Sequence, residues 1–150
     1  MILIVQRVNS SKLWADGKFV AEVGKGLVVF AGIFTDDSDV DINKAVEKVS
    51  ELRIFENENC KMDLSVRDIK GEVMLVPNFT VCGDTSHGRR PDFIKAARPE
   101  QAKPMFEQLY EKINSVIPTK EGVFGSDMRV VAENDGPVTI LIDTKSKLGK

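Results

Sequence analysis

The sequence has few of the residues that small proteins use for cross-linking or for nucleophilic catalysis. Its 150 residues contain one histidine and two cysteines, Cys60 and Cys82. The two cysteines form no CxxC pair, which argues against a zinc site and against a disulfide framework. We therefore expect two free structural thiols, which favours a reducing cytoplasmic compartment.

Long hydrophobic runs and an excess of positive charge are missing too. No run approaches the roughly 20 apolar residues that a membrane-spanning helix needs. The apolar start, Met1 to Arg7, lacks the basic region and the cleavage site of a signal peptide, so we interpret it as a first strand. The net charge of −2 gives no global sign of nucleic-acid binding. Any RNA contact would have to come from a local basic patch.

Common catalytic and cofactor motifs are also absent. The sequence has no HExxH, no phosphate-binding GxxxxGK[ST] and no GxGxxG. A Ser-His-Asp or Cys-His site would have to use His87, whose polar loop lacks the sharp strand-to-helix turn that presents a nucleophile. No pair of carboxylates stands out as an acid/base couple. We expect neither a metal nor a cofactor.

The hydrophobic pattern predicts one α+β domain that spans residues 1–150. One helix begins at residues 36–38 and runs to Leu52, and another lies between Pro99 and Ile117, with Pro104 in or near its first turn. One or two short strands lie between residues 55 and 71. The remaining strands are expected at 2–8, 12–16, 18–23, 27–33, 72–76, 128–132 and 138–143. Two helices for about seven strands predict a barrel-like, mostly antiparallel sheet flanked by helices.

Two segments could carry chemistry. Residues 77–81 follow a buried strand, and their spacing alone favours a strand end with a bulge. The alternative is a set of exposed backbone N–H groups beside the Thr80 hydroxyl, which could hold an oxyanion. Residues 134–139 look like a β-turn between two strands. Their alternative role is to present the Gly136-Pro137 backbone to a ligand, because glycine allows a close approach.

The loop between these segments is basic. It carries Arg89, Arg90, Lys95 and Arg98. The loop is either merely solvated or a patch that contacts phosphates, for which the forked donors of arginine are suited. The residues themselves leave both interpretations open.

Taken together, these segments resemble the D-aminoacyl-tRNA deacylase family. Matching motifs occur in the same order and at similar spacing across nearly the whole chain. They are Gln6-Arg7-Val8, Leu52-Arg53-Ile54-Phe55, Phe79-Thr80 with Gly88-Arg89-Arg90-Pro91-Asp92-Phe93, and Asn134-Asp135-Gly136-Pro137-Val138-Thr139. Four dispersed matches make the resemblance specific.

The resemblance implies a homodimer that hydrolyses the ester between tRNA and a D-amino acid. The Gly136-Pro137 peptide would be cis and would reach the partner's site, where its backbone oxygens clasp the substrate's amino group and exclude an L side chain. The N–H groups of Asn78, Phe79 and Thr80 would hold the ester carbonyl and its oxyanion. Either Thr80 is a nucleophile or the 2′-hydroxyl of the terminal adenosine helps to activate water. The shortage of acid/base side chains favours the second view.

The resemblance also assigns residues to binding. Substrate-binding residues would be Gly136, Pro137, Pro77, Met128 and Arg7. Those that contact tRNA would be Arg89, Arg90 and Lys95. The family's site needs no metal.

One motif departs from the family pattern. The family usually has Ser-Gln before Phe-Thr, whereas this chain has Pro77-Asn78. Pro77 has no N–H and no hydroxyl, and Asn78 is one methylene shorter than glutamine. A related branch with a proline here acts on a mischarged L-amino acid, but it also alters the Gly-Pro region, which is intact in this chain.

Other functions therefore stay open. The chain could be a catalytically weak member that binds RNA or another partner, or a paralogue with shifted specificity. An unrelated esterase that uses Ser86 and His87 is a more remote alternative. Whether glycine on the wrong tRNA is also a substrate is left open.

Overall fold

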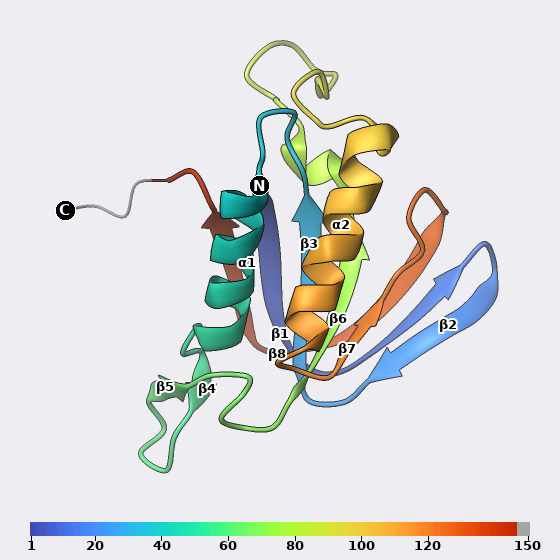
Figure 1. Ribbon diagram of the computed structural model, residues 1–150. Helices are drawn as coiled ribbons and strands as arrows, with labels where there is room; N and C mark the ends of the chain where they lie inside the picture. The colour runs from blue at the N-terminus through green and yellow to red at the C-terminus, as the bar shows by residue number, and fades with distance from the viewer. Residues whose placement is uncertain (147–150) are drawn as a thin grey trace.

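The computed structural model describes residues 1–146 and shows a curved mixed sheet with two helices packed on one face (Figure 1). The six-stranded sheet has the order β2-β1-β3-β6-β7, and β8 pairs with the other edge of β1. The pairings of β1 with β2, β3 and β8 are antiparallel, whereas β6 is parallel to both β3 and β7. The strands are β1 (Ile2–Ala15), β2 (Lys18–Val23), β3 (Gly26–Gly32), β4 (Phe55–Glu56), β5 (Met62–Leu64), β6 (Glu72–Pro77), β7 (Thr119–Glu121) and β8 (Met128–Asp143).

Both faces of the sheet are hydrophobic, and each contributes to a separate core. Alternate residues of β1, such as Leu3 and Val5, point into the core beneath the helices. Where β1, β2 and β8 curl away from the helices, Leu13 and Val23 join Met74 in a second, smaller core. The predicted α+β architecture, a barrel-like sheet flanked by two helices, is confirmed.

The first helix, α1 (Asp39–Glu51), begins as predicted. Ser38 is its N-cap, and the Ser38 N–H donates to the Asp41 carboxylate (3.0 Å) in a capping box. Ile42, Ala45 and Val49 face the core.

The second helix, α2 (Pro99–Asn114), begins at the predicted proline. Pro104 lies in its second turn, next to the first, and leaves the carbonyl of Glu100 without an intrahelical donor. Both residues are exposed, so water can bind that carbonyl, and the buried positions Phe106 and Leu109 continue undisturbed.

Three strand assignments were wrong. The predicted strands 2–8 and 12–16 form one strand, β1, because the polar residues Ser10 and Ser11 between them still pair with β8. Likewise, residues 134–137 do not form a turn between two strands but lie within β8. The register shifts in this stretch, which leaves Gly136 and Pro137 outside the ladder. Strand β7 was not predicted at all.

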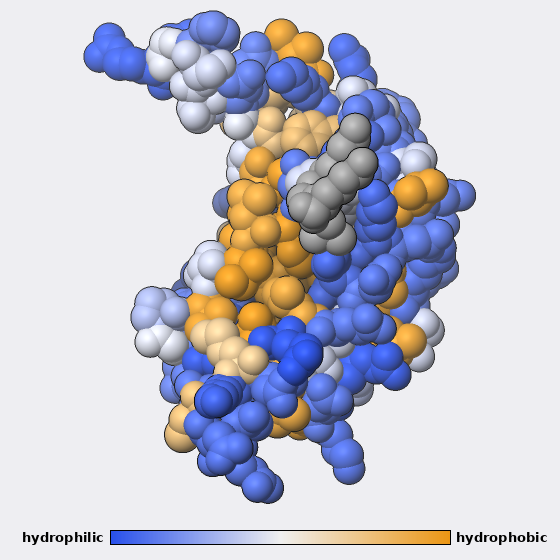
Figure 2. Space-filling view, turned by 90° about the vertical axis from the view of Figure 1, so that its left-hand side faces the viewer, coloured by the Kyte–Doolittle hydropathy of each residue, from blue (hydrophilic) through white to orange (hydrophobic). Residues whose placement is uncertain are grey.

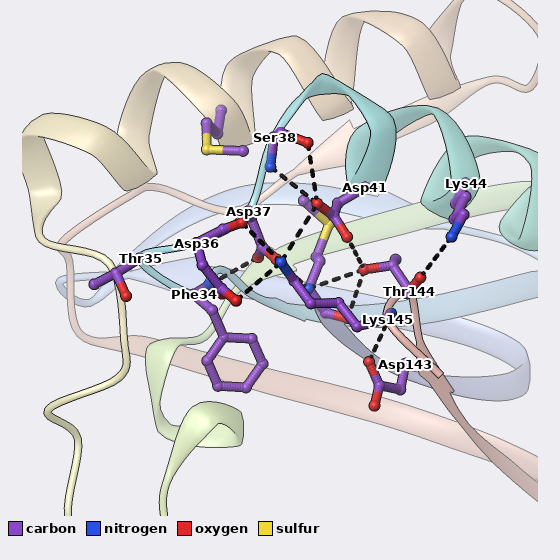
Figure 3. Close-up of polar contacts among 12 residues, drawn as sticks. Phe34, Thr35, Asp36, Asp37, Ser38, Asp41, Lys44, Asp143, Thr144 and Lys145 are labelled. Atoms are coloured by element: carbon purple, nitrogen blue, oxygen red, sulfur yellow. Dashed lines mark hydrogen bonds and ion pairs between the residues drawn. The ribbon is translucent and has the colours of Figure 1, made fainter. Parts of the chain in front are cut away.

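A polar cluster joins the end of β8 to the start of α1 (Figure 3). The Thr144 hydroxyl donates to Asp41 (2.6 Å), and the Met1 amino group donates to Asp37 (2.5 Å). Burial raises the pKa of Asp41, but hydrogen bonds from Thr144 and the Ser38 backbone, with nearby positive charges, hold it below its ordinary value. Lys145 adds an ion pair with Asp36 (3.1 Å). The cluster therefore stabilises the ionised form of Asp41.

Neither helix among the described residues has the length and hydrophobicity of a membrane-spanning segment.

Candidate functional site

A pocket of about 360 Å³ opens where the chain leaves β6. After Pro77, the chain enters a short 3₁₀ helix, η1 (Phe79–Cys82), whose N-cap is Asn78. The walls of the pocket come from the strand ends, the segment before α2, α2 itself and the loop after β7. They include Pro77, Asn78, Phe79, Phe93, Arg98 and Phe124. Three of the predicted site residues therefore line one pocket.

The backbone donors at this pocket are less available than the sequence suggested. The Asn78 N–H donates to the carbonyl of Ala31 (2.9 Å), and the Thr80 N–H donates to Asn78 Oδ1 (3.2 Å). Asparagine is a good N-cap because its short side chain reaches an N–H two residues further along the chain. Of the three expected donors, the Phe79 N–H at the first helical position is the one that helix geometry leaves free.

Thr80 is exposed, and its hydroxyl donates to Asn78 Oδ1 (2.5 Å). An amide oxygen can accept this hydrogen bond but is not a base that could take the proton. In this arrangement, Thr80 is not activated as a nucleophile.

Met128 lies close to Pro77, with Gly122 between them. The Gly122 N–H donates to the carbonyl of Leu75 (2.8 Å), which holds this loop against the end of β6. A Cβ atom on Gly122 would lie 2.7 Å from Met128 Sδ and 3.2 Å from Pro77 Cδ. The lack of a side chain at residue 122 thus allows the loop, β8 and the pocket wall to meet.

Arg7, Gly136 and Pro137 form a second group. The Gly136–Pro137 peptide bond is cis, as predicted. Arg7 is buried and donates from Nη1 to the carbonyl of Ile54 (2.7 Å) and from Nε to the carbonyl of Asp135 (3.2 Å). Nε also lies 3.2 Å from the Asp135 carboxylate. Arg7 therefore anchors the chain next to the Gly136–Pro137 bond, a role that its motif alone did not reveal.

The two groups lie well apart on the sheet within one chain. Pro77 is level with Leu3 across β3, whereas Gly136 lies opposite Arg7. Four residues along a strand span about 13 Å, and the three spacings from β8 to β6 span about 14 Å. The pocket and the Gly136–Pro137 segment of one chain therefore cannot form a single small site.

The basic residues lie in the exposed loop between η1 and α2. Arg89 and Arg90 are exposed and make no ion pair with any described residue. Lys95 lies 3.6 Å from Asp84 in an exposed pair that adds little stability. The structure brings Lys95 close to Asp84 and leaves both arginines accessible to a ligand.

The same loop argues against an esterase built on Ser86 and His87. The Ser86 hydroxyl donates to Asp84 Oδ1 (2.6 Å) and not to the imidazole. Hydrogen bonds from the Ser86 side chain and backbone hold the pKa of Asp84 below its ordinary value. Asp84 therefore acts as the acceptor of a local turn.

Aromatic residues of the pocket were only partly foreseeable. Phe93 belongs to a matching motif, and its ring meets that of Phe79 edge-on at 5.2 Å between centroids. Phe124 packs against Phe106 of α2 but lies in a loop without a recognisable motif. Only the tertiary structure shows that it belongs to the pocket.

Comparison with known proteins identifies the family. The family described as D-Tyr-tRNA(Tyr) deacylase matches residues 4–143. A D-aminoacyl-tRNA deacylase of Persephonella marina is 49% identical over 97% of this chain and 99% of its own, and one from Fusobacterium nucleatum is 46% identical over 97% of each chain.

Solved structures agree in fold. One described as c-Myc DNA Unwinding Element Binding Protein has a TM-score of 0.92 at 33% identity and covers 97% of this chain and 100% of its own. A probable eukaryotic D-amino acid tRNA deacylase, at 15% identity and a TM-score of 0.81, shares the fold over 94% of this chain and 97% of its own. The chain belongs to the D-aminoacyl-tRNA deacylase family.

Proposed function

We propose that this protein hydrolyses the ester bond of D-aminoacyl-tRNA and releases the free D-amino acid and tRNA. The observation that carries the proposal is the placement of the two family motifs. Phe79, which is followed by the exposed Thr80, lines an apolar pocket, and Gly136–Pro137 lies elsewhere on the sheet, anchored by Arg7. Curated relatives of nearly the same length bear the name of this activity.

The pocket provides for the substrate's reacting end. Its apolar walls suit the terminal nucleoside, which would bring the ester carbonyl to the Phe79 N–H. A donor placed where negative charge develops can lower the barrier by about 3–4 kcal/mol. Since the ester is already activated, positioning and this donor can suffice. Because Thr80 has no base beside it, we assign the activation of water to the 2′-hydroxyl of the substrate.

A second copy of the chain would complete the site. In a two-fold dimer, the partner's Gly136–Pro137 segment lies against Phe79 and supplies the rigid backbone that rejects an L side chain. The face of the sheet away from the helices is suited to this contact. A cross-strand row of Leu141, Ile4 and Phe30 lies on it, and Leu141 is 62% exposed. Figure 2 shows hydrophobic side chains gathered in a hollow on this side of the molecule.

The tRNA body would contact the exposed loop through Arg89, Arg90 and Lys95, and the enzyme would act in the cytoplasm. Neutralised phosphates make binding depend on salt. Arg89→Ala and Arg90→Ala should therefore weaken tRNA binding and flatten its salt dependence.

The decisive assay compares release of amino acid from D-Tyr-, L-Tyr- and Gly-charged tRNA, with and without a chelator. We expect release from D-Tyr-tRNA, none from L-Tyr-tRNA, and no effect of the chelator. Release of the L-amino acid would identify a paralogue with shifted specificity. No release from any substrate at micromolar enzyme would favour an RNA-binding member without activity. His87→Ala should change the rate by less than about tenfold, since side-chain base catalysis is worth about 10²–10⁴-fold.

The dimer has its own test. Leu141→Asp places a charge in the proposed interface, whereas Val40→Asp makes the same kind of change at an equally exposed apolar residue on α1 and serves as the control. We expect light scattering at micromolar concentration to give a dimer for the wild type and the control and a monomer for Leu141→Asp. A monomeric wild type would contradict the shared site.

A further inference from the structure

One charged residue lines the pocket beside Phe79. Among the described residues that form its wall, Arg98 carries a charge, Asn78 is polar, and the others are apolar, aromatic or glycine. We propose that Arg98 binds the phosphate that joins the terminal nucleoside to the rest of the substrate tRNA, an inference that rests on the proposed function. Arg98 would thereby distinguish an intact tRNA end from a bare aminoacyl nucleoside.

The position of Arg98 fits this role. It is the N-cap of α2 and is exposed, so it marks the mouth of the pocket and not its floor. Within residues 1–146, its guanidinium makes no ion pair, in contrast to Lys95, which lies near Asp84. A cation without a partner therefore lies next to an apolar cavity.

A nucleotide matches this arrangement chemically. Its base and sugar form an uncharged body, with the flat faces of the aromatic base suited to apolar walls, and a single anion is attached at one edge through the 5′-oxygen. A pocket of about 360 Å³ is within the range that holds small ligands. The forked donors of arginine suit two phosphate oxygens at once, which a lysine cannot match.

The helix that follows contributes little to this site. The N-terminal end of α2 is electropositive, but Pro99 has no N–H and Glu100 adds a negative charge in the first turn. These two residues offset what the helix would otherwise offer to an anion. The proposal therefore rests on the Arg98 side chain and the pocket together.

Three substrates of increasing length test the proposal. They are the 3′-D-tyrosyl ester of adenosine, the same ester of adenosine 5′-monophosphate, and D-Tyr-tRNA. Arg98→Gln should lower kcat/KM about 10- to 100-fold for the two that carry the phosphate, as expected for losing a charged hydrogen bond. It should leave the adenosine ester unchanged. Arg98→Lys should recover part of the loss.

Lys103→Gln is the matched control, because it makes the same change of charge at an exposed position of α2 away from the pocket. It should leave all three substrates unaffected. An equal loss on all three substrates in Arg98→Gln would show that Arg98 only shapes the pocket, and no loss would show that it is merely solvated. Either result overturns the proposal.

Binding separates this inference from the proposed activity. Calorimetry with adenosine and with adenosine 5′-monophosphate needs no turnover. We expect the monophosphate to bind more tightly to the wild type and the difference to disappear in Arg98→Gln. Equal affinity in the wild type would overturn the role of Arg98, even if D-Tyr-tRNA is hydrolysed. A preference for the monophosphate without hydrolysis of any ester would instead retain Arg98 and reject the proposed function.

Discussion

Replacing Arg7 by methionine should destabilise the protein strongly, because Arg7 connects three parts of the chain. It lies on β1 and donates to the buried carbonyl of Ile54 and to the carbonyl of Asp135. Methionine has similar length but no donor, so packing is largely kept. Hydrogen bonds to charged groups are worth about 1.5–3 kcal/mol each, so losing both should cost about 3–6 kcal/mol. A total stability in the middle of the usual range of about 5–15 kcal/mol would leave most of the protein folded.

Urea unfolding, followed by the fluorescence of Trp14, measures this loss. Asp135→Asn is the matched control, since it removes the ion pair but keeps the backbone carbonyl that Arg7 binds. The Asp135 side chain is 36% exposed, so we expect this change to cost less than about 1 kcal/mol. In deacylation assays, Arg7→Met should also reduce the preference for D-Tyr-tRNA, because the Gly136–Pro137 segment loses its anchor.

A free energy of unfolding within about 0.5 kcal/mol of the wild type would refute this reasoning, because surface substitutions without structural roles have effects of that size. If D-Tyr-tRNA hydrolysis then fell while stability stayed constant, Arg7 would bind the substrate directly, as its motif first suggested.

Three other outcomes are expected. Asn78→Gln should remove the cap and release the Thr80 N–H. We expect stability in urea unfolding to fall by about 1 kcal/mol and the rate of deacylation to rise. An unchanged rate would show that this N–H is not needed. The pKa of Asp41 is held below its ordinary value of 3.8, so its carboxylate stabilises the fold above that pH and the stabilisation is lost as the pH falls. Urea midpoints measured from about pH 2 to 6 should therefore fall less steeply with decreasing pH in Asp41→Asn than in the wild type. An equally steep fall in both proteins would contradict this. Burial and the nearby charge of Asp37 raise the pKa of the Cys82 thiol to about 11. A thiol reagent at pH 8 should therefore label the exposed Cys60 and spare Cys82. Rapid labelling of both thiols would contradict this.

The deacylase motifs could be recognised in the sequence because they are local. For Asn134 to Thr139, the residues alone favoured a turn, which was wrong, whereas the resemblance implied a cis Gly136–Pro137 bond; for residues 77–81, the residues favoured a strand end. Both segments are where the motifs indicated, and the Gly136–Pro137 bond is cis. The secondary-structure context was harder, since the polar stretch around Ser10 resembles a loop until its pairing with β8 is known.

The availability of donors could not be read from the sequence. Asn78 looked like a shortened glutamine, but as an N-cap it occupies the N–H of Thr80. Arg7 looked like a substrate-binding residue, but it bonds to carbonyls 47 and 128 residues away in the chain. Such roles depend on partners that are distant in sequence, so no local pattern contains them.

By itself, the sequence determined the fold class, the two helices and the family, because hydrophobic periodicity and short motifs depend on neighbouring residues. Only the tertiary structure decided that Phe93, Arg98 and Phe124 share a pocket with Phe79. It also placed Gly136 and Pro77 well apart in one sheet, on strands that are not neighbours. The physical reason is that strand register sets these distances, and a one-residue slip would turn every side chain of a strand to the other face of the sheet. Register is established by pairing along the whole length of β1.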